Sequence, residues 1–168
     1  MSLNNLVDES NHCQKNAGQY LSFSLDNEDY GVDILKVQEI RGWETARKIP
    51  ETPDYMKGVI NLRGVVVPIF DLRNRLGRGD TDYTATTVII VLKAKHEDEE
   101  YTIGLVVDAV SNVLDIETSD IKQVRSVNNQ ISTQYIIGMV ERDKQMVMLL
   151  DADKLFHAQD LDIGSQAI

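Results

Sequence analysis

The distribution of apolar and polar residues predicts short β-strands along most of the chain. Leu21, Phe23 and Leu25 alternate with residues that carry hydroxyl groups, which is the period of two expected for a strand with one buried face. Further runs rich in β-branched and other apolar residues are separated by turn-forming residues, at 59–60, 65–67, 88–92, 103–107 and 146–150. Such closely spaced runs are typical of a β-sandwich or of small β-barrels.

Helical signals are brief. The Thr-Pro-Asp sequence at residues 52–54 and the Thr-Ser-Asp sequence at residues 118–120 carry residues that favour helix starts. Residues 151–156 predict a terminal helix of a few turns at most. We therefore expect helices to lie around a fold whose core is made of strands.

The sequence contains an internal repeat. An ungapped alignment of residues 53–71 with residues 133–151 superposes Tyr55 on Tyr135, Gly58 on Gly138, Val67 on Val147 and Asp71 on Asp151. Upstream, Gly31, Val37 and Ile40 match Gly104, Val110 and Val113 at the same spacing. Each half is small for an independent domain, so we expect two small barrels that share a buried contact, with a groove along the seam between them.

The composition indicates one folded unit inside the cell. We expect a flexible leader over residues 1–18, a single domain over residues 19–156 with halves at about 19–82 and 83–156, and a tail over residues 157–168. The leader is polar, and no later apolar run reaches the length of a membrane span. The single cysteine, Cys13, has no intramolecular partner. These features predict a cytoplasmic protein without direct membrane insertion.

The charge disfavours nucleic acid and anionic lipid as partners, because the net charge is −10. Residues 36–78 nevertheless carry nine basic and five acidic residues. This positive segment would attract an acidic partner surface, although a solvated face is the simpler interpretation.

The sequence lacks the usual patterns of an enzyme. The three histidines lie in the leader, in an acidic stretch at residues 96–100 and in the tail, and no nucleophile, phosphate-loop or zinc pattern is present. The acidic stretch is expected to be a solvated hairpin loop. Asp71 and Asp151 would suit acid–base chemistry, but capping of the short helices that follow is the simpler role. We therefore predict no catalytic residue, no metal site and no cofactor.

Two segments together resemble a known family. Residues 58–72 predict a strand, a tight turn, a second strand and a helix start; Asn61 and Gly64 suit the turn, and Arg63 lies at its tip. With the Tyr-Gly-Val-Asp-Ile-Leu-Lys-Val-Gln-Glu-Ile-Arg-Gly sequence at residues 30–42, this stretch resembles the CheW family of chemotaxis coupling proteins over about residues 19–156. The resemblance implies a mainly β fold of two SH3-like five-stranded barrels with short helices and a C-terminal helix, and leaves open whether strands are exchanged between the barrels.

The resemblance also implies a function. Members of this family are non-enzymatic adaptors that couple the cytoplasmic tips of methyl-accepting chemoreceptors to the histidine kinase CheA in membrane-associated arrays. By position, the receptor-binding residues are Ile34, Val37, Glu39, Ile40, Gly58 and Arg63, and the kinase-binding residues are Gly64, Lys122 and Val127. Ile34 and Val37 are equally suited to plain core packing.

Two alternatives remain open from the sequence. A scaffold of another chemosensory-type pathway would share the fold and differ in its partners. A small hydrolase or metal-binding protein would use the carboxylates near the repeated strands.

Overall fold

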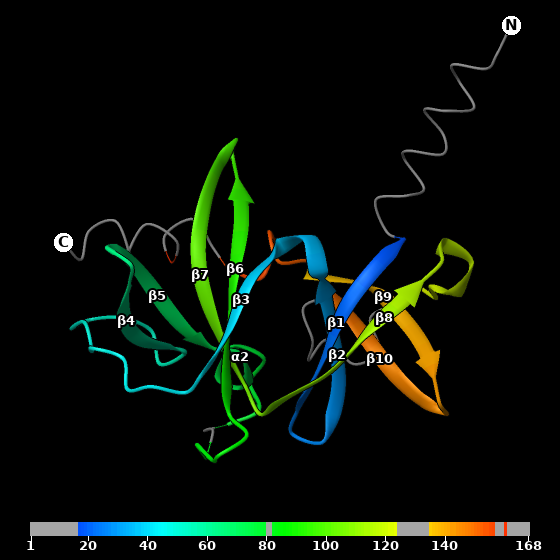
Figure 1. Ribbon diagram of the computed structural model, residues 1–168, viewed down its shortest axis with the longest axis horizontal. Coiled ribbons are helices and arrows are strands. Elements are labelled where there is room, and N and C mark those ends of the chain that lie inside the picture. Colours follow the sequence, from blue (N-terminus) through cyan, green and yellow to red (C-terminus); the bar gives the residue numbers. More distant parts are fainter. Residues whose placement is uncertain (1–16, 80–81, 124–134, 157–159, 161–168) are drawn as a thin grey trace, which may run out of the picture.

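The computed structural model describes residues 17–79, 82–123, 135–156 and 160, which form two five-stranded sheets (Figure 1). The first sheet has the order β8 (Ala109–Ile116), β1 (Gly18–Leu25), β2 (Glu28–Asp33), β10 (Gln145–Leu150) and β9 (Ile136–Arg142). The second has the order β3 (Val37–Gly42), β6 (Val88–His96), β7 (Glu99–Val107), β5 (Val65–Asp71) and β4 (Met56–Leu62). The predicted mainly β fold with two five-stranded units is confirmed.

Strands are exchanged between the two halves of the chain. β1 and β2 join β8, β9 and β10, whereas β6 and β7 join β3, β4 and β5. Each sheet therefore takes two strands from one half and three from the other. A boundary near residue 82 separates the two halves of the sequence repeat, but it does not separate the two sheets.

The sequence repeat is also a structural repeat. β2 runs parallel to β10 with Gly31 opposite Leu149, and β7 runs parallel to β5 with Gly104 opposite Ile69. These two pairs occupy equivalent repeat positions. Asp71 N donates to Tyr55 O at 2.6 Å, and Asp151 N donates to Tyr135 O at 2.8 Å. The two halves thus repeat the same hydrogen bond within each half and the same parallel strand pairing between the halves.

Three apolar clusters stabilise this arrangement. The largest, the inter-sheet core, contains Phe23 and Tyr30 from the first sheet and Phe70, Ile90 and Leu105 from the second. A first-sheet core and a second-sheet core lie on the opposite faces of the two sheets. β1 is therefore buried on both faces, and not on one as the alternation predicts: Phe23 contributes to the inter-sheet core and Tyr20 to the first-sheet core.

The helices whose bounds lie within the described residues are short, as predicted: η1 (Ile34–Lys36), α2 (Leu72–Arg75) and η2 (Thr118–Asp120). The helix predicted from residues 52–54 is a turn, in which Met56 N donates to Pro53 O at 3.0 Å and β4 begins immediately. The terminal helix predicted over residues 151–156 is also replaced by turns and bends. This segment is too short to sustain a helix alone, and burial of Leu155 and Phe156 in the inter-sheet core determines its path instead.

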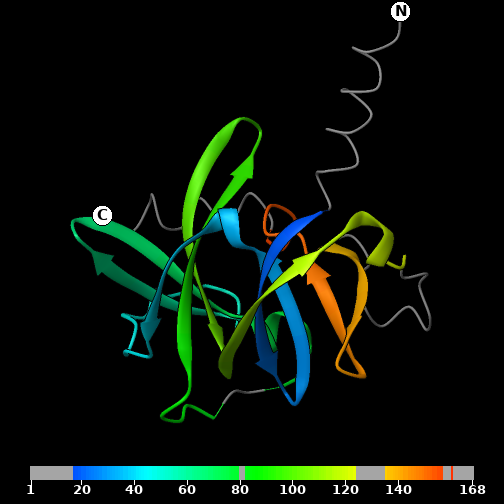
Figure 2. The ribbon, with the colours of Figure 1, turned by 45° about the vertical axis from the view of Figure 1, so that its right-hand side comes forward.

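The predicted helix-capping role of the repeated aspartates is confirmed for Asp71, whereas Asp151 makes a similar hydrogen bond in a turn that is not followed by a helix. The Asp71 carboxylate is fully buried and accepts hydrogen bonds from Arg73 N at 3.0 Å and Asn74 N at 3.4 Å. Asp151 accepts one from Asp153 N at 3.0 Å. The acidic stretch at residues 96–100 forms the tip of the β6–β7 hairpin, which projects from the body of the molecule (Figure 2).

Candidate functional site

The most distinctive surface lies where the edge strands β3 and β8 border the seam between the sheets. On β3, Val37 pairs with Leu92 and Ile40 pairs with Ile90, and both partners belong to the inter-sheet core. Directly paired residues project to the same face, and a bulge between Val37 and Glu39 changes the alternation. Val37 and Ile40 therefore share the face that looks onto the seam.

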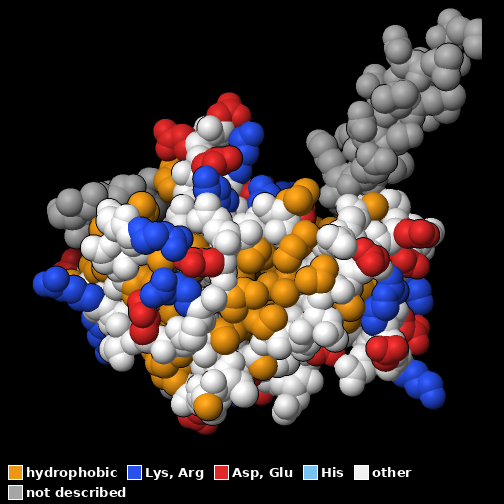
Figure 3. All heavy atoms as spheres, viewed as in Figure 1, with side chains coloured by type: hydrophobic (Ala, Val, Ile, Leu, Met, Phe, Trp, Pro, Cys, Tyr) orange, Lys and Arg blue, Asp and Glu red, His pale blue; other side chains and the backbone are white. Residues whose placement is uncertain are grey.

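β8 provides an equivalent second wall. Val110 pairs with Phe23 and Val113 pairs with Leu21, across a similar shift in register, and both partners belong to the inter-sheet core. Ile40 and Val113 occupy equivalent repeat positions and remain 45% and 48% exposed. Figure 3 shows apolar side chains gathered at the middle of this face, between the two sheets. We call this site the seam surface, and its members are Ile34, Val37, Ile40, Val110 and Val113.

An ion pair lies beside this surface. Arg63 Nη2 is 3.1 Å from Glu39 Oε1, and Arg41 Nη1 is 4.0 Å from the same oxygen. Arg63 is held at the tip of the β4–β5 hairpin by a tight turn, in which Asn61 Oδ1 accepts a hydrogen bond from Gly64 N at 2.8 Å. The Arg63 side chain is 76% exposed and that of Glu39 is 25% exposed. Arg63 therefore presents a largely accessible guanidinium whose position is set by Glu39.

The other predicted receptor-binding residues have different environments. Ile34 in η1 and Val37 are partly buried against the inter-sheet core, so they contribute to packing as well as to the seam surface. Gly58 has φ +134°, and a Cβ there would lie 2.2 Å from Arg47 O. The structure thus explains this glycine by the close approach of the segment around Arg47, which bridges to Val59. A contact between Gly58 and a partner stays a prediction.

Of the predicted kinase-binding residues, Gly64 and Lys122 lie on different sheets. Gly64 is exposed in the β4–β5 hairpin of the second sheet. Lys122 lies beside β9 of the first sheet, where Lys122 N donates to Met139 O at 2.8 Å. Val127 lies outside the described residues. The assignment of these three residues stays a prediction.

The sequence singles out neither the second wall of the seam surface nor Leu35. Val110 and Val113 appear in the repeat, but only strand exchange shows that their partners on β1, like those of Val37 and Ile40 on β6, belong to the inter-sheet core. Leu35 in η1 is 89% exposed, and nothing in its local pattern separates it from a buried leucine. The equivalence of Ile40 and Val113 is the signal that would have revealed the second wall.

Four titratable groups in the described residues have shifted pKa values. Burial raises the pKa of Tyr20, Tyr30 and Tyr55 to about 12, and a hydrogen bond from the backbone of Glu117 lowers the pKa of Asp120. These shifts arise from core packing and from a helix cap. In the described part of the chain, no three histidine, cysteine or carboxylate side chains are grouped to hold a metal ion.

Within the residues that the structure places, no helix combines the length and the apolar character needed to cross a bilayer.

The sequence and the fold were compared with known proteins. Residues 19–160 match the CheW-like domain. The chain is 41% identical to chemotaxis protein CheW of Klebsiella aerogenes, across 85% of this chain and 84% of that relative. It is 38% identical to the probable chemotaxis protein CheW of Rhizobium etli, across 82% and 86% of the two chains.

A solved structure shows the same similarity. The crystal structure of the scaffolding protein TtCheW from Thermoanaerobacter tengcongensis aligns with a TM-score of 0.75 and 33% identity, over 86% of this chain and 95% of that one. The fold and the sequence matches agree, and the protein belongs to the CheW-like domain family.

Proposed function

We propose that this protein is a chemotaxis adaptor that links the cytoplasmic tips of chemoreceptors to the histidine kinase CheA and has no catalytic activity of its own. The observation that carries the proposal is the seam surface, with apolar walls on both sides and the Arg63–Glu39 pair at its border. Membership of the CheW-like family supports the chemotaxis role. Recruitment to membrane-associated receptor arrays follows from this function.

The seam surface suits a helical partner. A receptor tip is a helical hairpin, and an amphipathic helix that lies in an apolar groove is a common recognition mode. Ile40 and Val113 would each lose exposed apolar area on contact. Arg63, with most of its guanidinium accessible, would pair with a carboxylate on the helix and set its orientation.

The kinase is expected to bind elsewhere, since a coupling protein must hold both partners together. Gly64 lies at the open β4–β5 tip of the second sheet and Lys122 beside β9 of the first. Two separate contacts, one on each sheet, would let this protein lie between two kinase domains in an array. Val127 is assigned to the same contact as Lys122.

Reconstitution tests the proposal directly. Purified CheA and a signalling receptor fragment are combined with and without this protein, and autophosphorylation of CheA is measured. We expect the receptor to control kinase activity only when the protein is present, and the Arg63→Glu variant to reduce this control. Equal kinase regulation without the protein would contradict the proposal.

The two alternatives make different predictions. A scaffold of another pathway would co-purify from its native cell with a receptor and a kinase of that pathway. A hydrolase or metal protein would contain stoichiometric metal or lose activity on Asp71→Asn or Asp151→Asn substitution. The hydrogen bonds that both carboxylates accept from backbone amides support the structural role instead.

A further inference from the structure

Each wall of the seam surface follows a crossover between the two sheets. Val37 begins β3 directly after η1, where the chain passes from β2 of the first sheet to the second sheet. Val110 lies near the start of β8, just after Asp108, where the chain passes from β7 of the second sheet back to the first. The path of each crossover therefore decides where its wall lies.

A carboxylate holds the first crossover. Both oxygens of Asp153 lie 3.1 Å from Nζ of Lys36, the last residue of η1. Asp153 Oδ1 also accepts a hydrogen bond from Lys95 N at 2.7 Å. Asp153 follows β10 of the first sheet, whereas Lys95 belongs to β6 of the second. This carboxylate thus ties the turn after β10 to the crossover and to the opposite sheet, and we call these contacts the first clamp.

An arginine holds the second crossover. Arg73 Nη2 is 3.1 Å from Asp26 Oδ1, and Arg73 Nη1 is 3.9 Å from Asp108 Oδ2. Asp108 Oδ2 also accepts a hydrogen bond from Asp26 N at 2.8 Å. Arg73 lies in α2, after β5 of the second sheet, whereas Asp26 lies in the turn between β1 and β2 of the first. We call these contacts the second clamp.

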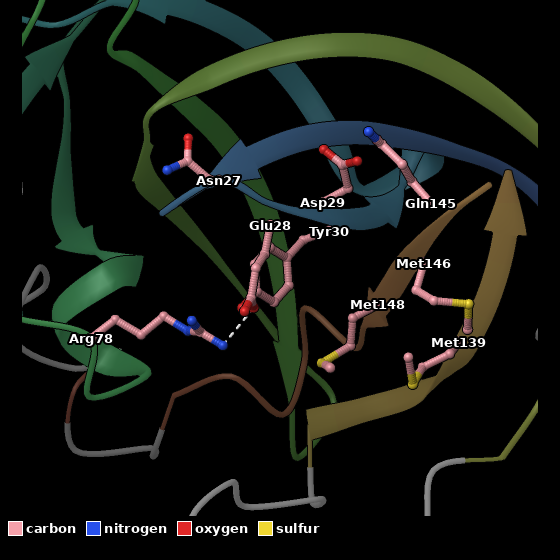
Figure 4. Close-up of a pocket in the computed structure, with 9 residues that line it drawn as sticks. All are labelled: Asn27, Glu28, Asp29, Tyr30, Arg78, Met139, Gln145, Met146 and Met148. Carbon is pink, nitrogen blue, oxygen red and sulfur yellow. Dashed lines mark hydrogen bonds and ion pairs between the residues drawn. The ribbon is translucent and has the colours of Figure 1, made fainter. Parts of the chain in front are cut away.

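Arg78 supports the second clamp. Its guanidinium is 3.7 Å from Asp26 Oδ2 and forms a second ion pair with Glu28, which Figure 4 shows at the edge of a hollow over the first sheet. The turn between β1 and β2 is therefore held by two arginines from the segment that follows β5.

The two clamps are equivalent in the repeat and opposite in charge. Arg73 and Asp153 are 80 residues apart, which is the spacing of the ungapped alignment. Asp153 attracts a lysine at one crossover, and Arg73 attracts an aspartate at the other. Both positions thus carry a charge complementary to their own crossover although the signs differ. This indicates that the attraction itself, and not one residue type, is what the position contributes.

The clamps are partly shielded from solvent. The side chains of Lys36, Asp153, Arg73 and Asp108 are between 24% and 31% exposed. Partly buried charges are screened less by salt than fully exposed ones. These ion pairs can therefore hold their crossovers more firmly than pairs on the open surface.

We propose that Asp153 and Arg73 are positioning residues for receptor binding, because each fixes one wall of the seam surface through the crossover before it. This inference rests on the adaptor function proposed above. Neither residue has to touch the receptor. Each pre-organises an apolar wall, so that less of the binding free energy is spent on ordering that wall.

Two substitutions separate the clamps. Asp153→Asn keeps an oxygen that can accept the hydrogen bond from Lys95 N but removes the charge that attracts Lys36. Arg73→Gln removes the charge that attracts Asp26 and Asp108. The circular dichroism of both variants should match that of the parent protein.

Methyl signals of the free protein test each clamp. The full chain is labelled with carbon-13 at the isoleucine and valine methyl groups. Asp153→Asn should shift the signals of Ile34 and Val37 and leave those of Val110 unchanged, whereas Arg73→Gln should do the reverse. A general loss of structure would move both walls in both variants. Shifts at both walls, or at neither, would overturn the proposal.

Binding of a soluble receptor signalling fragment, measured by calorimetry, tests the consequence. Asp153→Asn and Lys36→Gln should each weaken binding about two- to fivefold, the range of a single ion pair near the surface. The double variant should bind no more weakly than the single ones, because both changes remove the same contact. Glu97→Gln removes the same charge as Asp153→Asn at the exposed tip of the β6–β7 hairpin and should leave the affinity unchanged.

Equal losses for Asp153→Asn and Glu97→Gln, or additive losses in the double variant, would overturn the proposal. Failure of the parent protein to bind the fragment would refute the adaptor function itself. The methyl signals of the free protein would still decide whether the clamps position the walls, so the two failures are distinguishable.

Discussion

Arg63 and Glu39 form an ion pair at 3.1 Å that links the two ends of the second sheet, since Glu39 lies in β3 and Arg63 follows β4. β3 and β4 are the first and last strands in the order of that sheet. The pair therefore brings the hairpin tip to the strand that borders the seam surface. Exposed pairs contribute only about 0–1 kcal/mol to stability, so the contribution of this pair to binding is separable from its contribution to folding.

Charge reversal at Arg63 is the first prediction. Arg63→Glu places two carboxylates side by side and removes the cation offered to a receptor carboxylate. We expect binding to a receptor fragment, measured by calorimetry, to weaken about tenfold, or about 1.4 kcal/mol. Circular dichroism and the unfolding free energy should change little, within about 1 kcal/mol.

A charge swap is the control for this prediction. The double variant Glu39→Arg with Arg63→Glu restores an ion pair between the two positions but reverses which position carries the positive charge. If Arg63 acts through contact with the receptor, binding stays weak in the double variant. Recovery of normal affinity would show that only the internal pair matters.

The two walls of the seam surface give the second prediction. Ile40→Asn and Val113→Asn alter side chains that are about half exposed at equivalent repeat positions. Each should weaken receptor binding, about tenfold, while the fold is preserved. Met146→Gln, with a side chain exposed to a similar extent on another part of the first sheet, should not affect receptor binding. An effect of Ile40→Asn without an effect of Val113→Asn would mean that the partner uses β3 alone.

The sequence predicts the repeat units well and their assembly poorly. The local spacing that aligns Val37 and Ile40 with Val110 and Val113 is visible along the chain. That β2 pairs with β10 is a non-local relationship, however, and no local pattern encodes it. The alternation along β1 likewise predicts only one buried face. The other face, which carries Tyr20, is buried by strands from the other half of the chain, and the local pattern does not reveal them.

The candidate site shows the same limit. The family resemblance points to Glu39 and Arg63, whereas their contact depends on the closure of the second sheet. Leu155 and Phe156 look helical in isolation, but tertiary burial decides their conformation.

Buried tyrosines give the third prediction, a loss of stability at high pH. Tyr20 and Tyr30 are 1% and 2% exposed, and burial raises their pKa from 10.0 to about 12. Because the unfolded chain loses these protons first, their contribution is complete below pH 10 and is lost as the pH rises from 10 to 12. The slope is at most about 1.4 kcal/mol per pH unit for each tyrosine.

Urea unfolding between pH 8 and 12 measures this effect, with tyrosinate absorbance recorded on the folded protein. The Tyr30→Phe variant should lose stability less steeply than the parent over this interval, because one titrating group is absent. Ionisation of all tyrosines near pH 10 in a protein that is still folded would contradict the prediction.

Two equivalent glycines give the fourth prediction, because the exchanged strands approach them at different distances. A Cβ at Gly104 would lie 2.6 Å from Ile69 Cδ1, whereas one at Gly31 would lie 3.1 Å from Leu149 Cδ2. Gly104→Ala should therefore reduce the unfolding free energy, measured with urea, by about 1–3 kcal/mol, and Gly31→Ala should reduce it less. Ile69→Val removes the nearer of two close methyl groups, the other being Ile89 Cγ2 at 2.9 Å, so the double variant Gly104→Ala with Ile69→Val should be more stable than the sum of the single changes implies. Simple additivity would mean that the cost at Gly104 does not arise from the contact with Ile69.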